Sequence, residues 1–390
     1  MKTVAVIFGG RSTEHDISVI TALASVIKPL ILSKKYEVLP IYITKHGTWY
    51  ADVRLGEIEL FSQGTIQSLL AKLSPIQLDI NGHFSVVWPG GGLRSAKQRK
   101  IDIVFPAMHG MFGEDGDLMG LLEMACVPYV GCNVPSSVVA MDKVLAKQVT
   151  AADGIASTPW QWCTGREAVG QVDSVVANAT AQLSWPIFVK PAHLGSSIGI
   201  TRVANELELR NALEVAAHYD DKIIIEQGVA NLIEVTLPIM GNETLTPALL
   251  EQPLTSSEDF FDFETKYMHG GKKGGKNGTG KTTGAQGYSN LPAKLPDHLY
   301  KKAEQLGLAV YRSLGCTGTA RVDMLIDSET EEVYFNEVNP LPGDLYRHNW
   351  RQAGVSGVEL VDKLISLAEE RFATTNAKTT TFSTSFLKQF

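Results

Sequence analysis

The sequence predicts a protein of mixed class, α/β in its N-terminal part and α+β in the rest, with two or three domains. Its 390 residues exceed what one ordinary hydrophobic core encloses. The chain begins with a β-branched run, a glycine turn and a helical pattern, which is typical of an α/β domain. Farther along, pairs of strands joined by polar turns alternate with single helices, as in α+β domains.

The first expected unit opens with residues 2–8 (KTVAVIF), a β-branched strand that ends at a glycine pair. Apolar spacing from Ser18 onward indicates a helix. Further strands are expected at 36–44 and 101–110, and residues 127–131 close this unit.

The rest of the chain has an α+β pattern. A helix is expected near Ser136, a β-hairpin with a glycine-serine loop at 185–203, a helix at 204–217 and a strand at 221–227. Beyond these, strands are expected at 233–240, 320–327 and 332–338, and helices at 297–313 and 357–372.

Composition and charge exclude several classes of function. The net charge of −7 offers no basic surface for nucleic acid, so anionic ligands must be held by local groups. We identify no apolar run long enough to span a bilayer, and the N-terminus lacks the features of a signal peptide. The cysteines lack CxxC spacing and indicate reduced thiols in the cytoplasm, with a disulfide or a metal site as the minor alternative. They are Cys126, Cys132, Cys163 and Cys316.

Residues 275–282 fit the phosphate-loop pattern G-x-x-x-x-G-K-[ST], but their surroundings argue against that function. A phosphate loop joins a buried strand to a helix, and neither pattern flanks this segment. We interpret the glycine- and lysine-rich segment 269–287 as a lid that closes over a polyanion, and a disordered surface loop is the alternative. The lysines available for such contacts are Lys272, Lys273, Lys276 and Lys281.

The hairpin RVDMLIDSETEEVYFNEVN carries the strongest chemical signal. Alternation places Arg321 and Asp323 on one face of its first strand, and Glu337 and Asn339 on one face of the second. Three oxygen ligands suit Mg²⁺, and the guanidinium would stabilise a transferring phosphoryl group. The alternative is a hairpin with a solvated polar face.

Three other segments carry weaker signals. Lys190 lies within an apolar strand and needs an anionic partner, and the loop 195–197 that follows offers hydroxyls, including Ser197, to phosphate oxygens. Glu14 lies near a helix start, where a carboxylate also has a purely capping role. His109 lies in a loop after a strand.

Together these segments resemble the D-alanine–D-alanine ligases of the ATP-grasp superfamily, from about residue 2 to 372. The motifs that carry the resemblance are VIFGGRSTEHDIS, FPAMHGMFGEDG, VGCNVPSSVVAMDK, FVKPAHLGSSIGI, FETKY, GCTGTARVD and NEVNPLPG. It implies a three-domain ATP-grasp architecture: an N-terminal parallel-sheet α/β domain, a small central domain and a catalytic domain. The Thr-rich segment that follows is expected to be mostly a loosely ordered tail. The corresponding ranges are 1–131, 132–227, 228–373 and 374–390.

The resemblance also implies the reaction. ATP, with two Mg²⁺ ions or Mn²⁺ in their place, phosphorylates the carboxylate of one D-alanine, and the amine of a second D-alanine attacks the acyl phosphate. The product is the dipeptide used in peptidoglycan synthesis. A homodimer is usual in the family. From the net charge and the apolar runs we expect neither nucleic acid nor a membrane as a partner.

Site residues follow from the same resemblance. It implies ATP contacts for Lys143, Lys190, Glu226, Glu234 and Lys266 and metal binding for Asp323, Glu337 and Asn339. Glu14 matches the residue that binds the ammonium group of the first D-alanine, and His109 contacts its carboxylate. Ser196 and Tyr267 match a pair that forms a hydrogen-bonded triad with Glu14 and closes the lid.

The turn after Asn339 departs from the family pattern. In the family, a Ser-Leu pair follows the glycine, and its serine helps to hold the carboxylate of the second substrate. Here Gly343 is followed by Asp344-Leu345 on the short-turn alignment. On a longer-turn alignment the serine position falls near His348. Asp344 either turns away to bond backbone N–H groups, or pairs with Arg347 so that the arginine meets the acceptor carboxylate, or serves a different acceptor.

Three functions therefore remain open. The first is D-alanine–D-alanine ligation, and the second is the same chemistry with a hydroxy acid or another amino acid as acceptor. The third is nucleotide binding without ligation, which the intact metal face and lysines disfavour. The Lys266-Tyr267 pair favours the first over the second, because depsipeptide-forming relatives usually lack it.

Overall fold

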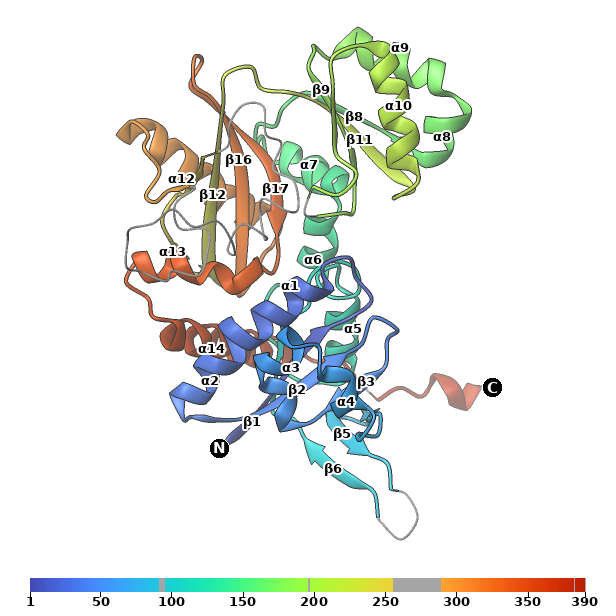
Figure 1. The fold of residues 1–390 in the computed structure, drawn as a ribbon, viewed down its shortest axis with the longest axis vertical. Helices are drawn as coiled ribbons and strands as arrows, with labels where there is room; N and C mark the ends of the chain where they lie inside the picture. The colour runs from blue at the N-terminus through green and yellow to red at the C-terminus, as the bar shows by residue number, and fades with distance from the viewer. Residues whose placement is uncertain (91–94, 196, 255–288, 382, 390) are drawn as a thin grey trace.

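The computed structural model describes residues 1–90, 95–195, 197–254, 289–381 and 383–389 (Figure 1). The chain forms three sheet-based units. The N-terminal unit occupies the lower part of Figure 1, and the C-terminal sheet and the smaller central unit lie side by side above it.

The N-terminal sheet has the order β3-β2-β1-β7. Its central strand β1 (Lys2–Gly9) pairs in parallel with β2 (Tyr36–Ile43) and β7 (Ile103–Pro106), and β3 (Trp49–Ala51) is an antiparallel edge. Every residue of β1 after Lys2 is buried, as expected for an inner strand covered on both faces. The predicted parallel-sheet α/β domain is confirmed.

A continuous helical stretch follows β1. It consists of α1 (His15–Ile20), the π-helical segment η1 (Thr21–Ile27) and α2 (Lys28–Ser33). Among the described residues, this stretch alone is long and apolar enough to cross a membrane, a feature that the sequence analysis did not identify. The fold buries 61% of its 18-residue apolar window, and Ile20, Ile31 and Leu32 remain exposed.

Shorter elements complete the N-terminal unit. They are η2 (Val53–Gly56), α3 (Ile58–Ser62), α4 (Ile66–Leu70), the antiparallel strands β4 (Gln77–Asp79), β5 (Ser85–Trp88) and β6 (Lys97–Lys100), and α5 (Asp117–Met124).

The single helix expected near Ser136 is two helices, α6 (Val134–Met141) and α7 (Lys143–Ala152). Asp142 separates them because its backbone is extended, with φ −105° and ψ 103°. Its side chain accepts hydrogen bonds from the first N–H groups of α7, which is the favourable arrangement of an N-cap aspartate.

The central unit is an antiparallel sheet covered by helices. Its strand order is β10 (Thr201–Val203), β9 (Ile187–Pro191), β11 (Lys222–Gln227) and β8 (Trp160–Thr164). Helices α8 (Gly165–Gly170), α9 (Val172–Gln182) and α10 (Glu206–Ala217) accompany it (Figure 1). The predicted hairpin, helix and strand are confirmed.

The C-terminal sheet is also antiparallel. Its order is β13 (Leu245–Pro247), β12 (Leu232–Gly241), β16 (Thr319–Asp327) and β17 (Glu332–Asn339). The helix α12 (Asp297–Ser313) packs against it, and β14 (Gln252–Pro253) pairs with β15 (Ser289–Asn290). The strands and the helix expected here are confirmed.

Three of the last elements return to the N-terminal unit: η3 (Gly343–Tyr346), α13 (Arg347–Gln352) and α14 (Gly357–Asn376). The short η4 (Phe386–Gln389) follows, with Phe386 and Leu387 exposed. In the N-terminal core, Trp350 and Leu364 share one buried cluster with Val4 and Phe8. The core of the first unit therefore includes residues from the end of the chain.

Candidate functional site

The β16–β17 ladder brings the polar residues of this hairpin together. Arg321 lies opposite Asn339, and Asp323 lies opposite Glu337. The shared face expected from residue alternation is thus present. All four residues are partly exposed, so their polar atoms remain accessible to a ligand.

Asp323 is held by three donors. The guanidinium of Arg321 forms a two-pronged contact, with Nε 2.7 Å from Oδ1 and Nη2 2.6 Å from Oδ2 of the carboxylate. Thr236 Oγ1 donates to Oδ1 at 2.6 Å. The guanidinium carbon of Arg321 also lies 5.0 Å from the centre of the Tyr346 ring, a cation–π contact. The candidate phosphoryl-binding arginine and the candidate metal ligand are therefore bound to each other.

The other two candidate metal ligands also have protein partners. Glu337 Oε2 lies 3.1 Å from Lys143 Nζ, and Asn339 Oδ1 accepts from the Leu341 N–H at 3.2 Å. Two carboxylates and an amide oxygen form a donor set that suits a hard divalent cation. Within the described part of the chain, no group of three His, Cys, Asp or Glu residues is placed to hold a metal ion.

A buried charge cluster lies where the central and C-terminal sheets meet. Glu226 pairs with Lys147 at 2.8 Å and with Lys190 at 2.7 Å. Lys147 is 1% exposed and also donates to the Phe335 carbonyl at 3.3 Å, and Lys190 donates to Asn336 Oδ1 at 3.4 Å. The lysine predicted to need an anionic partner therefore has one.

Burial and charge act in opposite directions on this cluster. Burial by itself would raise the pKa of Glu226, but its attraction to two ammonium groups outweighs burial and lowers the pKa to about 2. For Lys147 burial dominates and lowers the pKa. For Lys190 burial is outweighed by Glu226, so the pKa is raised. The cluster thus keeps a buried carboxylate fully ionised at neutral pH.

Lys147 was not identified from the sequence. It follows Lys143 by one helical turn in MDKVLAK, so both lysines lie on one face of α7. This four-residue spacing is the sequence feature from which Lys147 could have been identified. The carboxylate of Glu226, which the resemblance links to adenine, contacts both Lys147 and Lys190.

Glu14 is a buried carboxylate between two loops. It precedes α1 but makes no capping hydrogen bond with its side chain, so the capping alternative is not what the structure contains. A β-carbon placed on Gly110 would lie 2.9 Å from Glu14 Oε2, and one on Gly195 would lie 3.4 Å from the same atom. Glycine at these positions lets the N-terminal unit and the central hairpin loop approach one carboxylate.

His109 is buried beside this carboxylate. Its Nε2 lies 2.8 Å from Thr21 Oγ1, and its Nδ1 lies 3.3 Å from Glu114 Oε1. Burial acts to lower the pKa of His109, but the carboxylates of Glu114 and Glu14 outweigh burial and raise it. The imidazole is therefore more readily protonated than a free histidine.

The turn after Gly343 has an uncommon backbone. Asp344, Leu345 and Tyr346 all have left-handed φ angles, 54°, 51° and 50°. Such a run without glycine costs free energy and persists only where surrounding contacts impose it. Leu345 is buried in the N-terminal core, which anchors the turn.

The π-helical segment η1 supplies the polar contacts that hold this turn. Thr21 Oγ1 accepts from the Asp344 N–H at 2.9 Å, and Ser25 donates its hydroxyl to the Asp344 carboxylate. Arg347 Nε lies 3.0 Å from Asp344 Oδ2, and its Nη1 donates to the Ala24 carbonyl at 3.2 Å. The structure thus contains the Asp344–Arg347 ion pair that one of the three alternatives requires.

The remaining candidates are placed as follows. Ser197 has a left-handed φ of 59°, and Glu234 lies on β12 opposite Leu325. His348, the longer-turn candidate, pairs with Glu251 at 2.8 Å. All four cysteines are free thiols. Ser196, Lys266, Tyr267 and the segment 269–287, with its phosphate-loop-like pattern, lie outside the described residues.

Comparisons with known proteins agree with this arrangement. Residues 3–132 match the family model described as "D-ala D-ala ligase N-terminus", and residues 149–366 match "D-ala D-ala ligase C-terminus". A D-alanine--D-alanine ligase of Acetivibrio thermocellus is 35% identical over 382 residues, covering 95% of this chain and 96% of the relative. One from Thermoanaerobacter sp. is 36% identical over 379 residues, covering 95% and 97%.

Solved structures give the same result. The VanG D-Ala:D-Ser ligase of Enterococcus faecalis superposes with a TM-score of 0.77 at 31% identity, covering 94% of this chain and 99% of that one. The D-alanine-D-alanine ligase of Coxiella burnetii superposes with a TM-score of 0.74 at 27% identity, covering 96% of each. The chain therefore belongs to the D-alanine–D-alanine ligase family and has its ATP-grasp fold.

Proposed function

We propose that this protein joins two D-alanine molecules to D-alanyl-D-alanine, with ATP converted to ADP and phosphate, for peptidoglycan synthesis. The relatives named above support the reaction, since they match nearly the whole chain. The observation that carries the proposal is the contact between Lys143, at the start of α7, and Glu337 of the C-terminal sheet. It brings a candidate phosphate-binding cation to a candidate metal-binding carboxylate.

The nucleotide would be bound by an exchange of ion pairs. Lys143 releases Glu337 and turns to the phosphate oxygens, and Lys190 stays oriented by Glu226. Asp323, Glu337 and Asn339 would hold Mg²⁺, or Mn²⁺ in its place. When bound, the metal neutralises and orients the phosphates.

The first D-alanine would be bound by groups of opposite charge. Glu14 receives its ammonium group, and His109, whose pKa is raised, offers positive charge to its carboxylate. Arg321, once it leaves Asp323, stabilises the phosphoryl group as it transfers to that carboxylate. The amine of the second D-alanine then attacks the acyl phosphate, and phosphate leaves.

The acceptor site supports a second candidate, ligation of D-alanine to a different acceptor. Asp344 stands where the family pattern has serine, and its carboxylate lies on the predicted acceptor turn. A structural neighbour at 31% identity is a D-Ala:D-Ser ligase. We favour D-alanine as acceptor because Arg347 neutralises this carboxylate and brings a cation to the turn.

The test measures ADP release with D-alanine as the sole amino acid, followed by mass analysis of the product. We expect release only with Mg²⁺ and D-alanine both present, and a D-alanyl-D-alanine product. Parallel reactions add D-serine, D-lactate or L-alanine. Absence of dipeptide, or equal activity with L-alanine, would refute the proposal, and a dominant mixed product would establish the second candidate.

Two further parts of the proposal rest on the family resemblance. They are a cytoplasmic location, where the nucleotide is available, and a homodimer. Sedimentation of the purified protein tests the second.

A further inference from the structure

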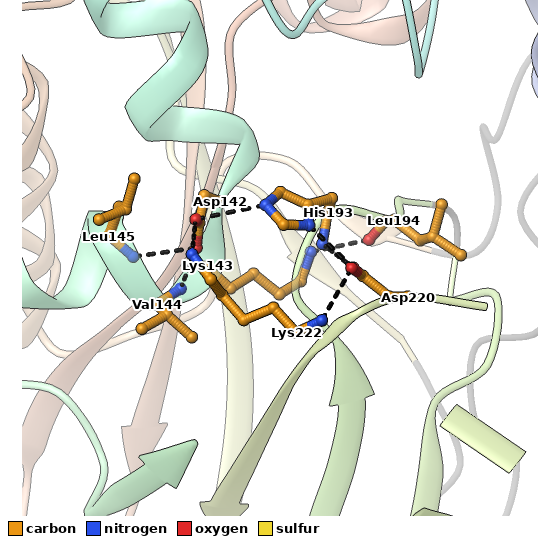
Figure 2. A network of polar contacts seen from close by, with 8 residues as sticks. All are labelled: Asp142, Lys143, Val144, Leu145, His193, Leu194, Asp220 and Lys222. Carbon is orange, nitrogen blue, oxygen red and sulfur yellow. Dashed lines mark hydrogen bonds and ion pairs between the residues drawn. The ribbon is translucent and has the colours of Figure 1, made fainter. Parts of the chain in front are cut away.

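A network of four charged side chains lies beside Lys143 and outside the contacts described so far (Figure 2). His193 follows β9, and its Nδ1 lies 2.9 Å from Asp220 Oδ1. Its Nε2 lies 3.3 Å from Asp142 Oδ2, an oxygen that also pairs with Lys222 Nζ. Asp142 and Asp220 are 4% and 8% exposed, so both carboxylates depend on these partners.

Backbone contacts make this network part of the local framework. The His193 N–H donates to Asp220 Oδ2 at 2.8 Å, and the Lys222 N–H donates to Asp220 Oδ1 at 3.1 Å. Asp142 Oδ1 accepts from the N–H groups of Val144 and Leu145 at 2.9 and 3.0 Å. The imidazole thus joins the N-cap of α7 to the turn between α10 and β11.

The network includes His193, which lies within the segment 192–194 whose carbonyl groups position Lys143. The Lys143 N–H donates to the Ala192 carbonyl at 3.1 Å, and its ammonium group donates to the Leu194 carbonyl at 2.8 Å. His193 lies between these two carbonyls in the chain, and Gly195 beyond them approaches the Glu14 carboxylate. Displacing His193 would therefore shift both acceptors of Lys143.

We propose that protonated His193 is a positioning residue for nucleotide binding: it holds the start of α7 against residues 192–195 and so fixes where the Lys143 ammonium group reaches. The inference rests on the proposed function, which assigns Lys143 to phosphate. Only the charged imidazole serves both carboxylates, because a neutral imidazole donates from one nitrogen alone. When His193 is charged, two cations balance the two carboxylates. When His193 loses its proton, one of the two carboxylates loses its imidazole donor.

The groups around His193 stabilise its charged form. Hydrogen bonds to Asp142 and then Asp220 raise the pKa of His193 to about 9, and burial opposes them without prevailing. The charged groups that face the imidazole are Asp142 at the start of α7, Asp220 in the turn after α10, and Lys222 on β11. The positioning contact is therefore complete at neutral pH and is lost as the pH rises through about 9.

The experiment measures binding of MgADP to the full-length protein by calorimetry between pH 7 and 9.5, without D-alanine. For the wild type we expect affinity to fall roughly threefold by pH 9.5, where about three quarters of a group with a pKa of about 9 has lost its proton, toward a limit of roughly tenfold, the effect of losing one charge-assisted hydrogen bond. His193→Asn should bind roughly tenfold more weakly already at pH 7. His193→Arg should lose the pH dependence, because a guanidinium stays charged and reaches both carboxylates.

A matched control separates this effect from the loss of any histidine. His298 on α12 pairs with exposed Glu331 at 2.9 Å and is itself 64% exposed. His298→Gln should bind MgADP as the wild type does across the whole pH range. Wild-type affinity in His193→Asn at pH 7, or a retained high-pH loss in His193→Arg, would overturn the inference.

A second measurement needs no variant. Because binding and protonation are linked reciprocally, MgADP should raise the pKa of the His193 imidazole followed by NMR. An unchanged pKa would overturn the inference. The outcome is also distinct from a failure of the proposed function: a wild type that binds MgADP but forms no dipeptide refutes the ligase and leaves His193 in its role.

Discussion

The buried charges Glu226, Lys147 and Lys190 neutralise one another in one cluster. The cluster has one carboxylate for two ammonium groups, so the carboxylate should matter more for stability than either lysine. Glu226 forms ion pairs with the ammonium groups of both Lys147 and Lys190. Removing a lysine leaves a neutral ion pair, whereas removing the carboxylate leaves two buried cations without it. The two changes should therefore have unequal costs.

We predict that Glu226→Gln lowers the free energy of unfolding by about 3–5 kcal/mol, the usual cost of leaving buried charges uncompensated. Lys147→Met should cost about 1–2 kcal/mol, because the pair between Glu226 and Lys190 survives it. Urea denaturation at pH 7 measures both. Equal losses in the two variants would contradict this account of the cluster.

The same carboxylate predicts a pH dependence. Because the pKa of Glu226 is depressed from 4.5 to about 2, its contribution to stability is fully present above pH 4.5 and is lost as the pH falls toward 2. In Glu226→Gln, the loss of stability between those two pH values should be smaller than in the wild type. Denaturation midpoints across that range supply the comparison.

At the acceptor turn, a bare aspartate about 4 Å from a substrate carboxylate would repel it by roughly 4 kcal/mol at an effective dielectric near 20. Since Arg347 pairs with Asp344, we predict that Arg347→Ala raises the Michaelis constant for the acceptor at least about tenfold. Asp344→Ser should leave D-alanine the preferred acceptor. An unchanged Michaelis constant for the acceptor in Arg347→Ala would show that Arg347 does not contact the acceptor.

At the scale of elements, the β16–β17 hairpin is the part of the site that local pattern determines most completely. A strand has a side-chain period of two, so the sequence predicted that Arg321 and Asp323 would share a face with Glu337 and Asn339, and the ladder confirms it. The hairpin of β9 and β10 was predicted from two strand patterns around a glycine-serine loop, and the first strand of the N-terminal sheet from a β-branched apolar run.

Other elements could not be predicted because their cause is not periodic. The break at Asp142 interrupts a continuous helical pattern, and it depends on one capping side chain. The left-handed turn at 344–346 contains no glycine, so its conformation follows from contacts with η1, a segment distant in the sequence. The partners of Lys147 likewise come from β11 and β17, which no local pattern connects to α7.

We predict that Glu337→Gln and Asn339→Ala each abolish turnover and leave the melting temperature within a few degrees of the wild type. Both side chains lie on the partly exposed polar face of β17, so each change removes a candidate metal ligand and no packing group. Dipeptide formation at saturating Mg²⁺ and thermal unfolding are the two measurements. As a control, Glu332→Gln on the same strand should retain full activity, because its exposed side chain pairs with Lys302 at the surface, away from the candidate metal ligands.

At the scale of the whole molecule, the proposed nucleotide site joins groups from two sheets. Lys190 belongs to the central sheet and Lys143 begins α7, and Asp323 and Glu337 belong to the C-terminal sheet. A ligand that carries both phosphate and metal satisfies both sets at once. The nucleotide alone, or the metal ion alone, satisfies only one of the two sets. It must then compete with the ion pair between Lys143 and Glu337 for its ligand.

We therefore predict that Mg²⁺ and ATP together raise the melting temperature more than the sum of their separate effects. At a ligand concentration of 100 times the dissociation constant, the stabilisation should be about 2.7 kcal/mol. Thermal unfolding with each component, with both, and with both plus EDTA measures the effect. Strictly additive shifts would contradict a site shared between the two sheets.

The return of the C-terminal helices to the first unit has a consequence for synthesis of the protein. Apolar residues of α14, among them Leu360 and Leu364, complete a core whose other members include Val4 and Phe8. While the ribosome is still adding the middle of the chain, the nascent N-terminal segment lacks these residues and exposes apolar surface. This core is therefore completed only when the part made last has emerged, and we expect a fragment that ends before α14 to expose apolar surface and to aggregate.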